Sequence, residues 1–236
     1  MSNNYFKFKR FTIEQDGCAM KVGTDGCLLG AWFRCEDCNR ILDVGAGTGL
    51  LSIMAAQRSN ATIVGVEIDR TTAEKAAENV NNSPWSDRIE IINTALQEYH
   101  TTEPFDSIVS NPPYFTNSLK CNNEQRTLAR HNDNLSPELL FSKAKELLNA
   151  NGHISLVLPT DTMSYWLDEA LFSGFAPHRI TYIKTTPRKA PKRVLVELQQ
   201  ACCNQPAIEQ LVLEESPGIY SKEACDLLRD FYLKIK

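Results

Sequence analysis

The feature that most constrains the fold is an apolar run that leads into a glycine-rich loop. Ile41-Leu42-Asp43-Val44 has the composition of a buried strand, and Gly45-Ala46-Gly47-Thr48-Gly49 follows it directly. Glycine tolerates the backbone angles of a tight turn and lets backbone N–H groups approach a ligand at a helix N-terminus. Leu50–Arg58 then has the pattern of a helix. These residues predict a strand–loop–helix unit, with a tight turn that binds nothing as the alternative.

The chain beyond this unit alternates strand-like and helix-like segments, which is typical of a parallel sheet. Further strands are expected at Thr62–Val66, Arg88–Asn93, Phe105–Val109, His153–Leu158, Arg179–Lys184 and Val194–Gln199. Further helices are expected at Thr71–Asn81, after Ser136-Pro137-Glu138, and at Asp161–Phe172. Thr71-x-x-Glu74 has the spacing of a capping box. We therefore expect a Rossmann-like α/β fold with a mostly parallel, seven-stranded sheet and helices on both faces.

Acidic residues flank the glycine loop in a way that indicates the ligand. Glu67-Ile68-Asp69 follows the strand Thr62–Val66, where a carboxylate can accept hydrogen bonds from ribose hydroxyls. A dinucleotide-binding loop would read Gly-x-Gly-x-x-Gly, but here the third glycine comes one residue earlier. Asp43 precedes the loop, and its charge would repel a pyrophosphate and attract a cation. The pattern favours S-adenosylmethionine, which carries a sulfonium and an α-amino group, over NAD.

A second motif, Asn111-Pro112-Pro113-Tyr114, follows the strand Phe105–Val109. The Asn111 side-chain oxygen and the Pro112 carbonyl form a pair of fixed acceptors, since proline fixes φ and has no N–H to compete. Such a pair suits the two hydrogens of a planar NH2 group, and Tyr114 offers a flat face for stacking. The simpler alternative for this motif is a turn.

Together, the glycine loop and the Asn-Pro-Pro-Tyr motif make the chain resemble class I S-adenosylmethionine-dependent methyltransferases that methylate exocyclic or amide nitrogens. Other segments resemble the tRNA1(Val) (adenine(37)-N6)-methyltransferase family more specifically. These segments are Phe8–Ile13, Cys18–Gly26, Leu28–Trp32, Ala129-Arg130-His131 with Leu135-Ser136, and Pro191–Leu195. The resemblance covers most of the chain, and Lys21–Gly26 is its most specific part.

The resemblance implies methyl transfer to the N6 amine of an adenosine in tRNA, adenine 37 of tRNA1(Val). The expected catalytic residues are Asn111, Pro112 and Tyr114. The expected cofactor-binding residues are Asp43, Gly45, Ala46, Gly47, Gly49, Glu67, Ile68, Thr94, Ala95 and Asn111. Thr94 occupies a place where relatives often carry Asp, so its contact with the adenine ring is left open.

RNA binding has to come from local basic groups, because the chain has a net charge of −4 and a pI of about 5.6. The candidate substrate-binding residues are Lys21, Asp25, Arg130, His131, Arg188, Lys189, Lys192 and Arg193. Each group has a simpler alternative. Lys21 and Asp25 suit a surface turn, His131 suits local packing in the polar loop 115–134, and the basic cluster 188–193 suits a solvated hairpin.

We expect one domain over the 236 residues. Residues 1–39 are expected over the cofactor site, residues 40–200 in the core sheet, and residues 200–236 in a C-terminal extension with an appended strand and a closing helix, Ser221–Leu233. No metal is expected, because Cys35-Glu36-Asp37-Cys38 lacks a second pair of ligands at zinc-site spacing. With no apolar run of membrane-spanning length, we expect a soluble, cytoplasmic protein, and the oligomeric state is left open.

Two other functions fit parts of the pattern. A protein N5-glutamine methyltransferase would present the same NH2 geometry to Asn111, but such enzymes usually carry an additional N-terminal helical domain. A non-catalytic RNA-binding module is the other alternative. The glycine loop, Glu67 and Asn111-Pro112-Pro113-Tyr114 together favour an enzyme over that module.

Overall fold

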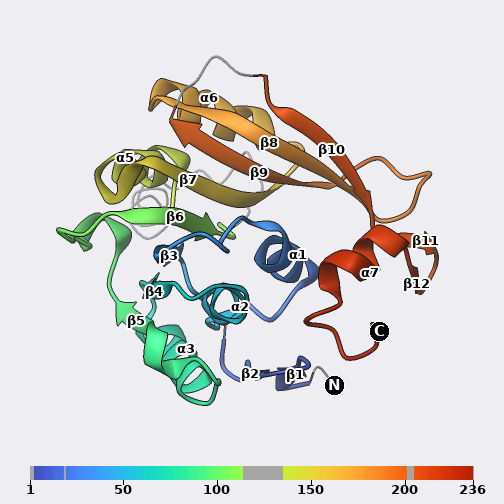
Figure 1. The fold of residues 1–236 in the computed structure, drawn as a ribbon, viewed down its shortest axis with the longest axis horizontal. Coiled ribbons are helices and arrows are strands. Elements are labelled where there is room, and N and C mark those ends of the chain that lie inside the picture. Colours follow the sequence, from blue (N-terminus) through green and yellow to red (C-terminus); the bar gives the residue numbers. More distant parts are fainter. Residues whose placement is uncertain (1–2, 19, 114–134, 201–204, 236) are drawn as a thin grey trace, which may run out of the picture.

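The computed structural model describes residues 3–18, 20–113, 135–200 and 205–235 (Figure 1). Its strands are β1 Tyr5–Lys7, β2 Thr12–Glu14, β3 Arg40–Val44, β4 Thr62–Glu67, β5 Ile89–Asn93, β6 Phe105–Ser110, β7 Leu148–Pro159, β8 Phe175–Lys184, β9 Arg193–Gln200, β10 Ala207–Val212, β11 Glu214–Ser216 and β12 Ile219–Tyr220. Its helices are α1 Thr24–Trp32, α2 Leu50–Arg58, α3 Arg70–Asn81, α5 Pro137–Leu147, α6 Met163–Phe172 and α7 Lys222–Leu228, with 3-10 turns η1 Ser86–Arg88 and η2 Leu96–Glu98.

The main sheet has the order β10-β8-β9-β7-β6-β3-β4-β5. β9 pairs antiparallel with β7 and β8, and the other neighbouring pairs are parallel. The expected Rossmann-like fold is confirmed, but within the described residues the sheet has eight strands instead of seven. The eighth is β10, which extends the sheet beyond β8. It corresponds to the strand expected in the C-terminal extension, and four of its six residues are exposed, as is typical of an edge strand.

Helices cover both faces of this sheet (Figure 1). α1, α2 and α7 pack on one face around buried residues such as Leu29, Met54 and Leu228. α5 and α6 cover the other face, where Phe141 and Trp166 meet edge to face. Because β7 lies between the two layers, its buried residues face apolar neighbours on both sides, which explains the nearly continuous apolar run seen in the sequence.

Local signals account for where the helices begin. Ser136 caps α5 by accepting a hydrogen bond from the N–H of Leu139, and Pro137 occupies the first turn. The expected capping box of α3 is wrong, however. Asp69 caps this helix through hydrogen bonds from Thr72, and Glu74 pairs with Arg70. An aspartate at the strand end is a better cap because its carboxylate reaches the free N–H groups directly.

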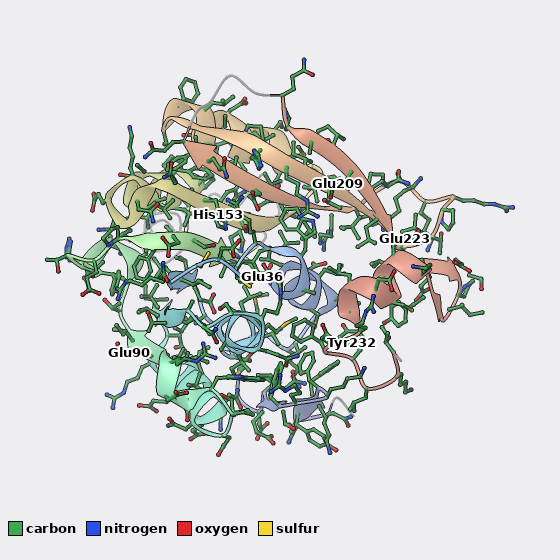
Figure 2. All side chains as sticks on the ribbon, viewed as in Figure 1. Glu36, Glu90, His153, Glu209, Glu223 and Tyr232 are labelled. Atoms are coloured by element: carbon green, nitrogen blue, oxygen red, sulfur yellow. The ribbon has the colours of Figure 1, made fainter. Side chains whose placement is uncertain are left out.

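The N-terminal and C-terminal segments pack together beside α2 and α3. Lys9 donates hydrogen bonds to the carbonyls of Arg229 and Ile235. The centroid of the Phe6 ring lies 6.0 Å from that of the Tyr232 ring, and Tyr232 is labelled in Figure 2. The closing helix is shorter than expected: α7 ends at Leu228, and the chain then turns. In the part of the chain described here, no helix combines the length and apolar character needed to cross a membrane.

The strand order reverses between β3 and β6. From β3 the chain proceeds outward to β4 and β5, then returns to place β6 on the other side of β3. Ligands of open α/β sheets bind at such a reversal, beyond the carboxyl ends of the strands. The glycine loop after β3, Glu67 at the end of β4 and Asn111 after β6 all lie at this edge.

Candidate active site

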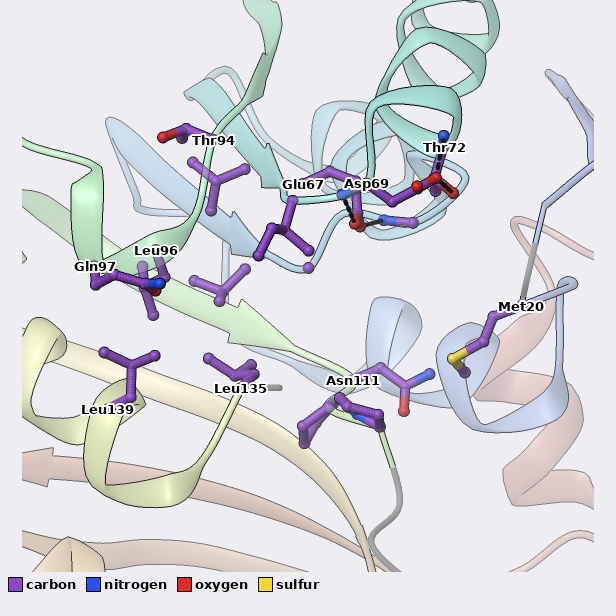
Figure 3. A pocket seen from close by; sticks show the side chains of 17 residues that line it. Met20, Glu67, Asp69, Thr72, Thr94, Leu96, Gln97, Asn111, Leu135 and Leu139 are labelled. Carbon is purple, nitrogen blue, oxygen red and sulfur yellow. Dashed lines mark hydrogen bonds between the residues drawn. The ribbon is translucent and has the colours of Figure 1, made fainter. Parts of the chain in front are cut away.

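A cavity of about 370 Å³ opens at this edge of the sheet (Figure 3). Its walls are largely apolar, and its polar side chains come from several different elements. The lining residues are Met20, Val44, Gly45, Gly47, Val66, Glu67, Ile68, Asp69, Thr72, Thr94, Leu96, Gln97, Asn111, Pro112, Pro113, Leu135 and Leu139. The predicted glycine loop, acidic strand end and Asn-Pro-Pro motif therefore face one common space.

The glycine loop is held in place by β4 beside it. Gly45, Gly47 and Gly49 all have positive φ angles, between 56° and 79°, which other residues rarely adopt. The N–H groups of Gly45 and Ala46 donate to the Val66 carbonyl over 2.9 and 3.1 Å. Ala46 and Gly49 lie outside the cavity wall, and Gly49 is the N-cap of α2. These two residues shape the loop and leave Gly45 and Gly47 to face the ligand.

Glu67 connects the loop to the start of α3. Its Oε2 accepts from the N–H of Gly47 over 2.9 Å, and its Oε1 accepts from the N–H of Asp69 over 3.0 Å (Figure 3). A carboxylate offers about four acceptor positions, so two remain for a ligand. Glu67 is half-buried at the cavity wall, where those positions are accessible.

Asp43 has a different position from the one the sequence suggested. It is fully buried on the α2 side of β3, outside the cavity wall, and its Oδ2 accepts from the N–H and the hydroxyl of Ser52 over 3.0 and 2.6 Å. Its Oδ1 is buried without a hydrogen-bond partner among the described residues. Burial raises the pKa of Asp43 to about 7. Asp43 therefore joins β3 to the first turn of α2 through Ser52 and does not line the cavity.

The N-terminal segment contributes to the site through Met20, which lies beside Asn111 (Figure 3). This segment is tied to the glycine loop by Asn79 of α3. The Asn79 amide donates to the carbonyls of Glu14 and Thr48 over 2.9 Å each and accepts from the N–H of Glu14. The broader expectation that residues 1–39 lie over the cofactor stays a prediction.

The far end of the cavity is formed by residues that the sequence analysis missed. Leu96 and Gln97 of η2 face Leu135 and Leu139 at the start of α5. Thr94 lines the cavity, and its hydroxyl lies 3.3 Å from the Ala95 carbonyl. Ala95 is buried outside the cavity wall, and contact of either residue with the donor stays a prediction. Gln97 could have been proposed from the sequence, because it follows strand β5 closely. Leu139 could not, because it reaches the site only through folding.

Asn111 is placed by β6 and by α1. The hydroxyl of Ser110 donates to the Val44 carbonyl over 2.7 Å and fixes the end of β6 against β3. On the other side, a methyl group placed on Gly26 would lie 3.9 Å from the Asn111 amide nitrogen. The amide nitrogen therefore faces α1. Pro112 and Pro113 line the cavity, and Tyr114 lies outside the described residues.

The candidate substrate-binding residues divide into three groups. Arg188, Lys189 and Lys192 are exposed in the hairpin between β8 and β9, and Lys21 is exposed before α1. Asp25 and Arg193 bind each other, with Arg193 Nε 2.7 Å from Asp25 Oδ2. Arg130 and His131 lie outside the described residues. Helix α1 itself was not predicted, because its buried run includes two glycines, Gly26 and Gly30, and gives a weak helical pattern.

These features fit S-adenosylmethionine. The apolar wall formed by Val44, Val66 and Ile68 suits an adenine ring, and Glu67 suits ribose hydroxyls. The unpartnered Oδ1 of Asp43 suits a nearby cation and disfavours a pyrophosphate. Across the described ranges, no group of three or more His, Cys, Asp or Glu side chains is arranged to hold a metal ion.

Solved structures resemble this fold. A predicted O-methyltransferase from Agrobacterium tumefaciens superposes with a TM-score of 0.70 at 21% identity, over 88% of this chain and 96% of that one. A ribosomal protein L11 methylase from Lactobacillus delbrueckii subsp. bulgaricus superposes with a TM-score of 0.57 at 16% identity, over 80% of this chain and 84% of that one. At such identities the likeness concerns the fold alone.

Sequence comparison is more specific. The family model described as the methyltransferase small domain matches residues 26–172. Proteins named tRNA1(Val) (adenine(37)-N6)-methyltransferase from Bacteroides fragilis and Parabacteroides distasonis are each 46% identical to this chain, over 241 and 237 aligned residues. Both alignments cover 100% of this chain and 100% of the relative. The glycine loop, the Asn-Pro-Pro motif and full-length similarity agree, and the chain belongs to the tRNA1(Val) (adenine(37)-N6)-methyltransferase family.

Proposed function

We propose that this protein transfers a methyl group from S-adenosylmethionine to the N6 amine of adenine 37 in tRNA1(Val). The observation that carries the proposal is the position of Asn111. It lies at one end of a cavity whose other wall contains the glycine loop and Glu67, so a donor and a target amine can meet there. Full-length similarity to enzymes of that name supports the choice of substrate.

The donor half of the site would be formed by Gly45, Gly47 and Glu67, with Ile68 and Thr94 against the adenine ring. When bound, S-adenosylmethionine supplies an electrophilic methyl group on a positively charged sulfonium. Asp43, buried below the glycine loop, would stabilise the positive charge of the donor through its field. In this proposal Ala46, Gly49 and Ala95 act by shaping the backbone around the donor.

The acceptor half would be formed by Asn111, Pro112 and Tyr114. An adenine N6 amine is a poor nucleophile because its lone pair is delocalised into the ring. The Asn111 Oδ1 and the Pro112 carbonyl would each accept one amine hydrogen and favour a more tetrahedral nitrogen, whose lone pair can point at the methyl group. Fixed acceptors of this kind accelerate a reaction by positioning and by electrostatics. Tyr114 would stack on the target base, which must be flipped out to reach the site.

RNA would bind through exposed basic side chains at the same edge of the sheet. The hairpin that carries Arg188, Lys189 and Lys192 joins the end of β8 to the start of β9, and β9 begins opposite Pro159 at the carboxyl end of β7. Asn111 follows the neighbouring strand β6. Since the whole molecule is acidic, a local cluster of this kind has to supply the phosphate contacts. Lys21, Arg130 and His131 are further candidates.

The experiment that tests the function is identification of the modified nucleoside. Purified protein is incubated with S-adenosylmethionine and an unmodified tRNA1(Val) transcript, and the digested RNA is analysed by mass spectrometry. We expect N6-methyladenosine with the wild-type transcript and none with a transcript whose adenine 37 is replaced by guanine. The Asn111→Ala variant is the matched protein control.

Two results would contradict the proposal. Methylation of the transcript lacking adenine 37 would leave the enzyme class intact but move the target to another adenosine. Labelling of a protein glutamine without labelling of tRNA would identify an N5-glutamine methyltransferase instead.

A further inference from the structure

Helix α1 is held at both of its ends by contacts with distant elements. Near the C-terminal end, Arg58 donates to the Gly30 carbonyl over 2.7 Å, and the Trp32 indole donates to the Thr181 hydroxyl over 3.0 Å. At the start, the N-cap residue Gly23 has no side chain with which to cap the helix. The first turn is instead tied to the sheet by the Asp25–Arg193 ion pair, with 2.7 Å between Nε and Oδ2.

This first turn lies directly behind Asn111. A methyl group on Gly26 would approach the Asn111 amide nitrogen to 3.9 Å and the Leu50 side chain to 3.2 Å, so the turn and Asn111 are close neighbours. Asn111 can present either its oxygen or its NH2 group to a bound amine, because the two ends of an amide have nearly the same shape. Only the oxygen accepts a hydrogen from the target amine. A shift of this turn would therefore change which end of the Asn111 amide faces the cavity.

The ion pair also connects this turn to the basic hairpin. Arg193 is the first residue of β9, and its guanidinium additionally donates to the Lys192 carbonyl over 3.0 Å. The side chains of Asp25 and Arg193 are only 25% and 32% exposed, so their attraction is less screened than that of a surface pair. A half-buried pair between elements 168 residues apart fixes their relative position.

We propose that Asp25 and Arg193 are positioning residues for the methyl transfer. Their ion pair holds the first turn of α1 behind Asn111 and keeps the Asn111 oxygen directed at the target amine. This inference rests on the proposed function, in which Asn111 is the acceptor. It assigns to Asp25 and Arg193 a role different from direct contact with RNA.

The test is a mutant cycle with separate measurements of kcat, KM for tRNA and affinity for S-adenosylmethionine. Asp25→Asn and Arg193→Gln should each lower kcat by about tenfold or more, since small misplacements of a reacting geometry have effects of this size. The double variant should lose no more than about the larger single loss, because both changes break the same pair. Donor affinity should change by less than about twofold.

Glu103→Gln is the matched control. Glu103 pairs with Arg40 over 2.6 Å at the opposite end of β3, so this variant also removes an arginine–carboxylate pair. It should keep the wild-type kcat. Thermal unfolding of every variant identifies any that fails to fold, and a loss of kcat counts only in a variant that binds the donor normally.

A second readout concerns the amide itself. In an Asn111→Asp background, both ends of the side chain are oxygens, so its orientation no longer matters. Asp25→Asn should then lower kcat much less than it does in the wild-type background. A general loosening of the fold would lower kcat equally in both backgrounds.

The inference is overturned if Asp25→Asn retains the wild-type kcat. It is also overturned if Arg193→Gln raises only the KM for tRNA and Asp25→Asn lowers that KM. Such a pattern identifies Arg193 as a phosphate contact that Asp25 restrains. Failure of the proposed function looks different: wild-type protein would then leave tRNA1(Val) unmethylated. In that case the same cycle is measured on the amine that the wild-type protein does methylate.

Discussion

The Glu67 carboxylate accepts a hydrogen bond from the Gly47 N–H over 2.9 Å, which joins the end of β4 to the glycine loop of β3. Each of these residues was expected to contact the donor independently. Their direct contact means that the carboxylate both organises the loop and presents its remaining acceptor positions to the cavity. A change at Glu67 should therefore affect the donor more than the loss of one contact alone would.

Glu67→Ala should weaken S-adenosylmethionine binding by about tenfold or more, because hydrogen bonds to charged groups contribute about 1.5–3 kcal/mol each. Isothermal titration calorimetry measures the effect. Glu90→Ala is the matched control, since Glu90 is an exposed carboxylate on the neighbouring strand β5, outside the cavity wall. Equal affinities of Glu67→Ala and wild-type protein would remove Glu67 from the donor site.

Asn111→Ala should lower kcat far more than it lowers donor affinity. The Asn111 oxygen matters most as the amine becomes tetrahedral, so its loss acts on the transition state. Single-turnover kinetics with tRNA and calorimetry with the donor separate the two effects. Turnover at the wild-type rate would reduce the Asn-Pro-Pro motif to a turn.

Tyr114→Ala should raise KM for tRNA and lower kcat, whereas Tyr114→Phe keeps the stacking face and should be milder. Steady-state kinetics on the two variants measure this difference. If Phe and Ala at this position behaved alike, the hydroxyl and not the ring face would be the important group.

Neutralising Arg188 and Lys189 together should weaken tRNA binding and leave donor affinity unchanged. Each lost phosphate contact should flatten the salt dependence of binding by a slope of about 0.7–0.9. Binding titrations at several salt concentrations give this slope. Lys145→Gln together with Lys234→Gln removes the same charge from positions outside the cavity wall and this hairpin, and should leave the slope unchanged.

His153 on β7, labelled in Figure 2, predicts a pH dependence of stability. Burial lowers the pKa of His153 below its ordinary value, and the neutral ring bridges the Arg34 carbonyl and guanidinium over 2.8 and 3.2 Å. Because the unfolded chain then takes up the proton more readily, folding stability is fully present above about pH 6.5 and falls as the pH decreases towards the lowered pKa of the folded state.

His153→Gln should reduce this acid-induced loss, since glutamine does not titrate. Urea unfolding of wild-type protein and variant at pH 7.5 and pH 5 measures the difference. His178→Gln is the control, because His178 is exposed on β8, which β9 separates from β7. An identical pH dependence in His153→Gln and wild-type protein would exclude His153 as the cause.

The sequence by itself determined the features that depend on local backbone chemistry. Glycines at positive φ specify the loop after β3, prolines fix the backbone beside Asn111, and apolar runs identify the buried strands. Because consecutive parallel strands end at one edge of a sheet, their order also brought Glu67 and Asn111 to one cavity. Those inferences need only short-range rules and the topology of an α/β fold.

Only the tertiary structure decided the features that depend on contacts between distant residues. Asp25 and Arg193 form one ion pair although 168 residues separate them, and Asp43 turns away from the cavity towards Ser52. Gln97 reaches the cavity wall through the fold, and only the strand pairing shows that β10 lies beside β8. The direction of a side chain and the partner of a charge are set by packing and burial, which no local pattern encodes.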